Sequence, residues 1–262
     1  MATVRRWHAV VFASEVYMQF ALIDGLRSKA RPGLAGVCQT CTSPVIPRCG
    51  SRRAWHWAHR GLRQCDPWWE ETEWHVGWKA KFPTECQEIL QYAANGEKHI
   101  ADVKMPDGRV IEFQHSPLKN EERDARELFY KSMIWVVDGL ARKRDLPGFK
   151  KTLWQVSENP LVYSGHSHDC ALLRDWFGRP VDVFFDFGEP NLWQLHPSPE
   201  GVVIFTSVPV TVFIETLHKG ISFRRIRFTS SNAPAPTPYQ PHRLAVGLPH
   251  YLPRLRRRGH RF

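Results

Sequence analysis

Apolar and polar residues alternate most regularly between residues 99 and 115. Pro106-Asp107-Gly108 interrupts this stretch, and an Asp-Gly pair between two alternating runs predicts a β-hairpin. A three-residue loop, with Gly108 in a left-handed bulge position, pairs Asp102 with Glu112 across the hairpin. A two-residue loop would instead pair Val103 with Glu112 and move Asp102 to the opposite face.

The three-residue loop sorts the hairpin side chains by polarity. One face then carries the apolar residues Val103, Met105, Ile111 and Phe113, and the other carries Asp102, Lys104, Glu112 and Gln114. Because register follows the buried face, we predict this arrangement. Facing carboxylates repel unless a cation lies between them or one is protonated, and such oxygen ligands suit Mg²⁺ or Mn²⁺. An exposed polar face without function would produce the same pattern.

The segments before and after this hairpin both show the periodicity of an α-helix. Trp74, Trp78 and Phe82 recur every fourth residue, so residues 68–94 are predicted as a helix. Residues 118–133 are typical of a charged amphipathic helix, and MIWVVDG after them is typical of a buried strand. The order helix, hairpin, helix, strand predicts an α/β fold with a mixed sheet.

The flanking regions are predicted to be mainly strands. Near the N-terminus, HAVVFA is β-prone and FALIDGL contains an Asp-Gly turn signal. In the C-terminal half, VDVFFDF, GVVIFTS and VTVFIETL are strand candidates. The proline-rich stretch from 233 to 253 is typical of an extended linker.

Charge is distributed unevenly along the 262 residues. The formal net charge is +10, made up of +6 over residues 1–70, −6 over 71–217 and +10 over 218–262. Basic flanks around an acidic centre are typical of a nucleic-acid protein whose centre collects carboxylates. Arg256, Arg257 and Arg258 would contact phosphates, or they belong to a solvated tail. The chain has no apolar run long enough to span a membrane and no signal-peptide pattern, so we expect a cytoplasmic protein.

Four of the six cysteines lie between residues 37 and 65. Cys38 and Cys41 form one closely spaced pair, and His56 and His59 form another. Two such pairs predict a tetrahedral, structural zinc site, because each tight turn presents two ligands to one ion. Cys49 and Cys65 are rival ligands.

Ordered motifs across about residues 35–140 resemble the CoiA-like family of competence proteins. The motifs are Cys38-x-x-Cys41, His56-Trp-Ala-His59, Glu73-Trp-His75-x-x-Trp-Lys79, His99-Ile-Ala-Asp102-Val, Ile-Glu112-Phe-Gln114-His115-Ser116, an Arg-rich helix ending in Tyr130, and Trp135-Val-Val. The pattern of Asp102 followed by Glu112-x-Gln114 also resembles the PD-(D/E)XK nuclease superfamily.

The resemblance implies a restriction-endonuclease-like core with a small zinc-stapled module before it. It divides the chain into a zinc-binding β-rich module at 1–66, a nuclease-like core at 67–148, a region of mixed strands at 149–232 and a proline-rich basic tail at 233–262. The implied activity is metal-dependent DNA cleavage in DNA uptake or recombination, with single- or double-stranded DNA and recombination or uptake proteins as partners.

The resemblance also assigns roles to residues. Asp102 and Glu112 carry over as ligands of Mg²⁺ or Mn²⁺, and Glu73 matches the helical acid of the superfamily, with Glu71 as its rival. Gln114 stands where the superfamily commonly has Lys and cannot supply positive charge. His75 or Lys79 takes that role, or a second metal does, or the enzyme is weak.

The helix after the hairpin and the tryptophans each allow two interpretations. Arg123, Arg126 and Tyr130 share one helix face, which would hold DNA phosphates or form salt bridges on a helix surface. Exposed tryptophan rings near the zinc segment would stack single-stranded bases, or the rings fill the core of the module; these are Trp55, Trp57, Trp68 and Trp69.

Two other classes of function compete with the nuclease. A non-catalytic DNA-binding or recombination-mediating protein would retain the fold, and Gln114 in place of Lys favours it. A regulatory zinc module acting on protein partners is the weaker alternative, because it leaves the Asp102 and Glu112 face unexplained. Oligomeric state leaves no signal in the sequence.

Overall fold

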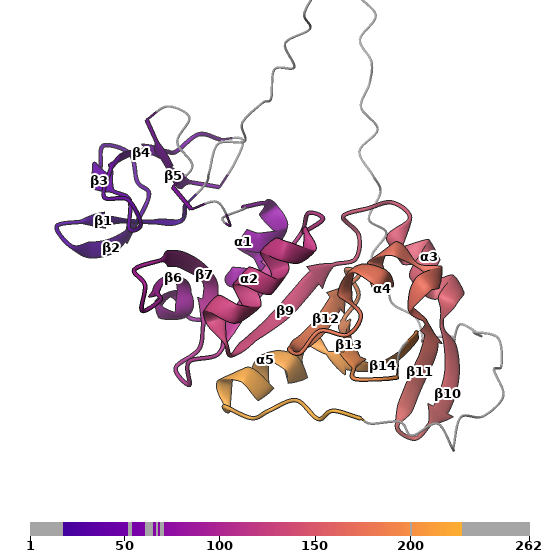
Figure 1. Cartoon of the computed structure of the whole chain (residues 1–262). Helices are drawn as coiled ribbons and strands as arrows, with labels where there is room; N and C mark the ends of the chain where they lie inside the picture. The colour runs from indigo at the N-terminus through magenta and orange to yellow at the C-terminus, as the bar shows by residue number, and fades with distance from the viewer. Residues whose placement is uncertain are drawn as a thin grey trace, which may run out of the picture.

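The computed structural model describes residues 18–51, 54–60, 65–66, 68, 71–199 and 201–226. These residues form a mixed α+β structure with two sheets (Figure 1). The strand predicted from HAVVFA, the proline-rich stretch and the arginines at 256–258 lie outside the described residues. Within the described residues, no helix is both long enough and apolar enough to cross a bilayer.

The smaller sheet is antiparallel and has the order β2-β1-β3-β4-β5. Its strands are β1 (Phe20–Ile23), β2 (Leu26–Lys29), β3 (Gly36–Val37), β4 (Pro44–Arg48) and β5 (His56–His59). Asp24 and Gly25 connect β1 to β2 with φ of 50° and 79°, the left-handed conformation of a two-residue hairpin turn. The turn predicted from Asp-Gly is therefore confirmed.

The larger sheet has nine strands in the order β10-β11-β14-β13-β12-β9-β8-β7-β6. The strands are β6 (Gln87–Tyr92), β7 (Lys98–Lys104), β8 (Val110–Gln114), β9 (Met133–Asp138), β10 (Trp154–Glu158), β11 (Leu161–His166), β12 (Asp182–Asp186), β13 (Asn191–His196) and β14 (Val202–Pro209). β8, β9 and β12 run parallel, and the other pairings are antiparallel. β12 pairs directly with β9, so the boundary predicted at 148/149 does not separate two sheets.

Five α-helices are described. They are α1 (Glu73–Lys79), α2 (Asn120–Tyr130), α3 (Asp145–Thr152), α4 (Ala171–Trp176) and α5 (Val210–His218). Trp78 from α1 and Phe213 and Leu217 from α5 pack on one face of the large sheet, against Val103, Ile111 and Phe113. Tyr130, Phe149 and Leu172, from α2, α3 and α4, belong to the core on the opposite face.

The β7–β8 hairpin has the predicted register. Val103 pairs with Ile111, and Lys104 pairs with Val110. Gly108 has φ of 90° in the three-residue loop, and its N–H donates to the Met105 carbonyl over 2.9 Å. The four residues predicted to form the apolar face all lie in one buried cluster.

The long helix predicted over residues 68–94 is wrong in its extent. α1 ends at Lys79, a 3₁₀ turn covers Thr84–Cys86, and β6 begins at Gln87. Pro83 lies between the helix and the turn, and proline lacks the N–H that an α-helix needs. The periodicity of Trp74, Trp78 and Phe82 therefore arises from one short helix and the turn after it. All three side chains pack on the same hydrophobic cluster.

The strand predicted from VTVFIETL is also wrong, because these residues form α5. Pro209 ends β14 and stands at the N-cap of the helix. Phe213 and Leu217 are four residues apart and both buried, while Val212 is largely exposed. The β-branched residues suggested a strand, but burial follows the helical period, and tertiary packing overrides a weak propensity.

Candidate functional site

Three acidic residues lie side by side on three neighbouring strands. The register of β6 with β7, Gln87 opposite Val103 and Ile89 opposite Ala101, sets Glu88 opposite Asp102. The register of β7 with β8 sets Asp102 opposite Glu112. All three are at most 5% exposed, so the row is buried.

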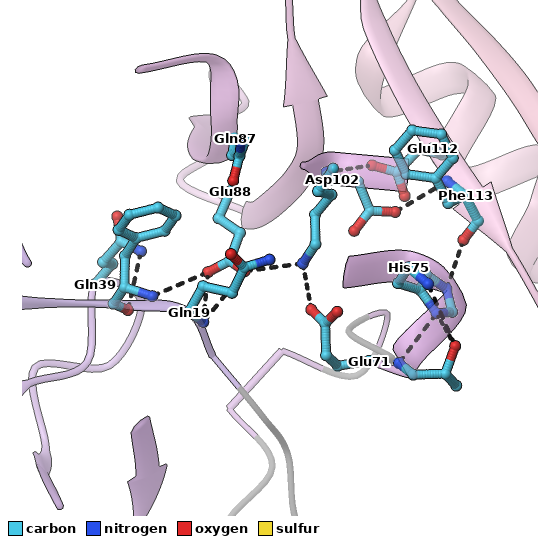
Figure 2. A network of polar contacts seen from close by, with 12 residues as sticks. Gln19, Gln39, Glu71, His75, Gln87, Glu88, Asp102, Glu112 and Phe113 are labelled. Carbon is cyan, nitrogen blue, oxygen red and sulfur yellow. Dashed lines mark hydrogen bonds and ion pairs between the residues drawn. The ribbon is translucent and has the colours of Figure 1, made fainter. Parts of the chain in front are cut away.

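β7 and β8 stop pairing where Asp102 and Glu112 meet. The last backbone pair on this side is Val103 with Ile111. Beyond it, backbone N–H groups of the two strands donate to carboxylates instead of to the backbone of the other strand. The Asp102 N–H donates to Glu112 Oε1 over 3.2 Å, and the Phe113 N–H donates to Asp102 Oδ2 over 2.9 Å (Figure 2). These hydrogen bonds satisfy the N–H groups that the separated strands leave open. They also orient both carboxylates, which confirms the predicted pairing.

Lys79 projects from the C-terminal end of α1 into this row. Its ammonium is fully buried, donates to Glu88 Oε1 over 2.8 Å and bonds to Glu71 as well. Burial alone would lower the pKa of Lys79, but Glu88 and Glu71 outweigh it and raise the pKa. The two acids therefore favour the protonated, positively charged form of Lys79.

The acid beside α1 that bonds to Lys79 is Glu71, two residues before the helix begins. Its side chain is 4% exposed, and its Oε1 is buried without a hydrogen-bond partner. Glu73, the residue predicted for this role, is exposed on the first turn of α1. Thr72 caps the helix between them, so the two acids leave the helix start in different directions.

The carboxylates crowd one another in a dry environment. Burial, followed by the charge of Asp102, raises the pKa of Glu112 to about 8. Burial raises the pKa of Glu71 to about 8 as well, because the attraction of Lys79 does not compensate for lost hydration and repulsion by Glu88. Such a cluster retains protons until a further cation neutralises it.

His75 has a structural role in α1. Its Nδ1 accepts from the Thr72 backbone N–H over 3.1 Å, and the Thr72 hydroxyl accepts from the His75 N–H, which forms a capping box. Its Nε2 lies 2.8 Å from the Phe113 carbonyl oxygen. His75 thus joins α1 to β8.

Gln114 lies beyond the carboxylate row on β8. It is 4% exposed, and its amide donates to the Ser116 carbonyl over 2.8 Å. Lys79, with its bonds to Glu71 and Glu88, brings the positive charge that Gln114 cannot supply. Of the two residues predicted to take that role, Lys79 bonds to acids at the row, whereas His75 contacts Thr72 and Phe113.

The face of α2 predicted to bind phosphates is directed into the protein. Arg126 donates to Glu112 Oε2 over 3.2 Å and to the Trp68 carbonyl over 2.8 Å. Arg123 bonds to the Asp175 carbonyl, and its guanidinium lies 5.1 Å from the ring centroid of Trp176. Tyr130 is buried in the core. These side chains are not available to DNA, because the helix buries this face against the sheet.

A second cluster in the small sheet can hold a zinc-type metal. Its donors are Cys38, Cys41, His59 and Cys65, whose ligand atoms all lie within 4.8 Å of one another. Cys38 Sγ is 3.5 Å from Cys65 Sγ, and Cys41 Sγ is 3.3 Å from His59 Nε2. The hydrogen bond from Cys65 lowers the pKa of Cys38 to about 4, which favours the thiolate form that binds metals. Three sulfurs and one imidazole are a common tetrahedral zinc set.

His56 does not belong to this cluster, contrary to the predicted ligand set. His56 and His59 are the two ends of β5, and side chains three positions apart in a strand point to opposite faces. His56 Nδ1 instead lies 2.8 Å from the Ala54 carbonyl oxygen. Cys65, a rival in the sequence, takes the place of His56, and Cys49 packs beside the small core.

The small sheet is bound to the carboxylate row through Glu88. The N–H groups of Gln19 and Phe20 both donate to Glu88 Oε2, over 3.0 and 3.3 Å (Figure 2). Glu88 adopts φ of 50°, which is unusual for a residue with a side chain. One carboxylate thus receives hydrogen bonds from the module and from Lys79, which places the module directly beside the site.

The sequence analysis missed Glu88 as a site residue and Cys65 as a preferred metal ligand. In both cases the cause is a strand that was not recognised. Assigning residues 68–94 to one helix hid β6, and without β6 no register connects Glu88 with Asp102. Recognising QEILQY as a strand antiparallel to β7 would have revealed the row. Recognising HWAH as a strand would likewise have excluded His56.

Residues 36–67 match the family model described as Competence protein CoiA, N-terminal domain. The match covers β3 to β5 and the Cys–His cluster and ends before α1. It supports a relation to the CoiA family. No curated protein and no solved structure matches the chain.

Proposed function

We propose that this chain is a metal-dependent deoxyribonuclease of the PD-(D/E)XK type that acts in DNA uptake or recombination. The observation that carries the proposal is the buried row of Glu88, Asp102 and Glu112 where β7 and β8 separate. The order α1, β6, β7, β8, α2, β9 resembles the core of that superfamily. The match of residues 36–67 to CoiA supports the biological setting.

The chemistry of the donors fits a hard divalent cation. Asp102 and Glu112, with Glu71 beside them, offer carboxylate oxygens, which Mg²⁺ and Mn²⁺ prefer. The raised pKa values of Glu71 and Glu112 and the unpartnered Glu71 Oε1 are typical of carboxylates short of positive charge. A bound Mg²⁺ would lower the pKa of a water molecule and polarise a phosphate.

The residues around the row would then orient and hold the phosphate group. Lys79 keeps its proton and would stabilise the charge that grows on the phosphate during hydrolysis. Arg126 holds Glu112 in place, and the backbone N–H of Phe113 holds Asp102. The Cys–His cluster would bind zinc in a structural role, because four protein ligands leave no open position for water.

The test is cleavage of labelled single- and double-stranded DNA in Mg²⁺, in Mn²⁺ and in EDTA. We expect Asp102→Asn and Glu112→Gln each to lower the rate by about 100-fold or more, because each removes a charge and keeps the shape. Glu85→Gln is the matched control, since Glu85 is exposed three residues before Glu88. Circular dichroism establishes that each variant folds. Cleavage in the presence of EDTA would overturn the proposal. Cleavage at the wild-type rate by both Asp102→Asn and Glu112→Gln would overturn it as well.

One arrangement favours a non-catalytic DNA-binding or recombination-mediating protein instead. Lys79 and Arg126 already neutralise part of the row, and in the described part of the chain the carboxylate oxygens do not converge as the Cys–His donors do. Salt-dependent DNA binding by the wild type without cleavage in either metal would establish this second function.

A further inference from the structure

A pocket of about 350 Å³ lies between the small sheet and the start of α1. The module contributes one wall and residues 71–76 contribute the other. Trp55 stands in this lining with 52% of its surface exposed. The lining includes Gln19, Trp55, Glu71 and Val76. The volume is at the lower end for ligand sites, which are roughly 300–1,000 Å³.

The pocket and the carboxylate row share Glu71. The carboxylate of Glu71 bonds to Lys79 through one oxygen, while its other oxygen is buried without a partner. Glu88 receives hydrogen bonds from the backbone of Gln19 and Phe20, which holds the module wall against the row. A group in the pocket therefore lies next to the proposed reaction centre.

The lining indicates the chemistry of the occupant. It is mainly apolar, contains the acids Glu71 and Glu73, and includes no lysine or arginine among the described residues. A phosphate would be repelled, whereas a flat uncharged ring would fit. Gln19 and Glu71 are lining residues whose side chains hold a buried polar atom without a hydrogen-bond partner in the described structure, the amide nitrogen of Gln19 and the Oε1 of Glu71.

We propose that this pocket binds an unpaired DNA base, stacked on Trp55, and that the chain therefore prefers single-stranded DNA or single-stranded ends. Bases within a duplex are stacked and paired and cannot enter such a pocket, whereas a base in a single strand can. This inference rests on the proposed function, because it names the substrate class of the same site. Of the tryptophans considered for stacking, Trp57 fills the module core and Trp68 lies against His99.

The test measures binding in EDTA, so that cleavage plays no part. A labelled single-stranded oligothymidine, the same oligomer with abasic sites and a duplex of equal length are compared by fluorescence anisotropy. We expect the wild type to bind oligothymidine about 10-fold more tightly than the abasic strand, since the two carry equal charge and differ in stacking. Trp55→Ala should abolish this difference, and Trp55→Phe should restore part of it.

Two further variants keep the test specific. Val76→Phe narrows the pocket from α1 and should also abolish the preference for bases. Tyr92→Ala removes an exposed aromatic residue on β6 and should leave it unchanged. Equal binding of the abasic strand by wild type, or an unchanged preference in folded Trp55→Ala, would overturn the inference. Cleavage of DNA without a preference for bases would contradict the base-binding pocket and support the nuclease activity. A preference for bases without cleavage would support the pocket and contradict the nuclease activity.

Discussion

The ammonium of Lys79 is fully buried among carboxylates that come from different parts of the chain. Glu71 precedes α1, and Glu88 is the second residue of β6, which follows the helix. A buried charge is tolerated only when it is paired and hydrogen-bonded, and here Lys79 pairs with one oxygen of Glu71 and one of Glu88. Lys79 thus determines both the stability of the row and its net charge.

Replacing Lys79 with Met should destabilise the metal-free protein by about 3–5 kcal/mol, because it leaves buried carboxylates without their cation. Urea denaturation measures the change, and the double variant Lys79→Met, Glu88→Gln should recover part of it. Lys81→Met is the control, since Lys81 is exposed. Equal stability of Lys79→Met and wild type would contradict the assigned charge pairing.

At the scale of the element, β5 explains which residues of the Cys–His segment can share an ion. A strand presents alternate residues to one face, so only one of His56 and His59 can face the cysteines. Cys65, six residues after the end of β5, has its Sγ 3.5 Å from Cys38 Sγ. The same rule sets the Asp102 and Glu112 pair, because a hairpin register decides which side chains meet.

Metal content distinguishes the two zinc ligand sets. We expect the Cys65→Ala protein to lose tightly bound zinc, and His56→Asn and Cys49→Ala to retain it, because only Cys65 lies with the other donors. Zinc per chain after dialysis against a chelator is the measurement. Loss of zinc in His56→Asn with retention in Cys65→Ala would restore the ligand set predicted from the sequence.

At the scale of the whole molecule, the nine-stranded sheet carries the site and joins the central and C-terminal regions. His196 on β13 lies deep in its C-terminal half. Its Nε2 is 2.7 Å from the Thr206 hydroxyl, and its Nδ1 accepts from the Ile226 N–H. Burial lowers the pKa of His196 to about 4, although Asp182 opposes this and Arg225 reinforces it.

This lowered pKa predicts how stability depends on pH. Between about pH 6.5 and pH 4 the unfolded chain binds a proton at His196 and the folded chain does not, so acid favours unfolding. We expect His196 to account for a loss of about 2 kcal/mol as the pH falls through this window. His196→Gln should flatten that part of the profile in urea denaturation series, and His218→Gln, at an exposed position, should not. A profile unchanged by His196→Gln would show that the imidazole is not held neutral.

Local rules determined several features from the sequence alone. The Asp24-Gly25 turn, the three-residue hairpin loop and the alternation of apolar residues follow from interactions between close neighbours in the chain. They were sufficient to predict that Asp102 and Glu112 face each other. The closely spaced Cys38 and Cys41 likewise predicted a metal cluster.

Only the tertiary structure decided which partners complete these features. Glu88 lies beside Asp102 because β6 pairs with β7, and Arg126 reaches Glu112 because α2 buries its arginine face. Cys65 replaces His56 because β5 is a strand, and VTVFIETL becomes α5 because its apolar face covers the sheet. Sequence patterns report local conformation, whereas these choices depend on contacts between distant segments whose packing energy outweighs local preference.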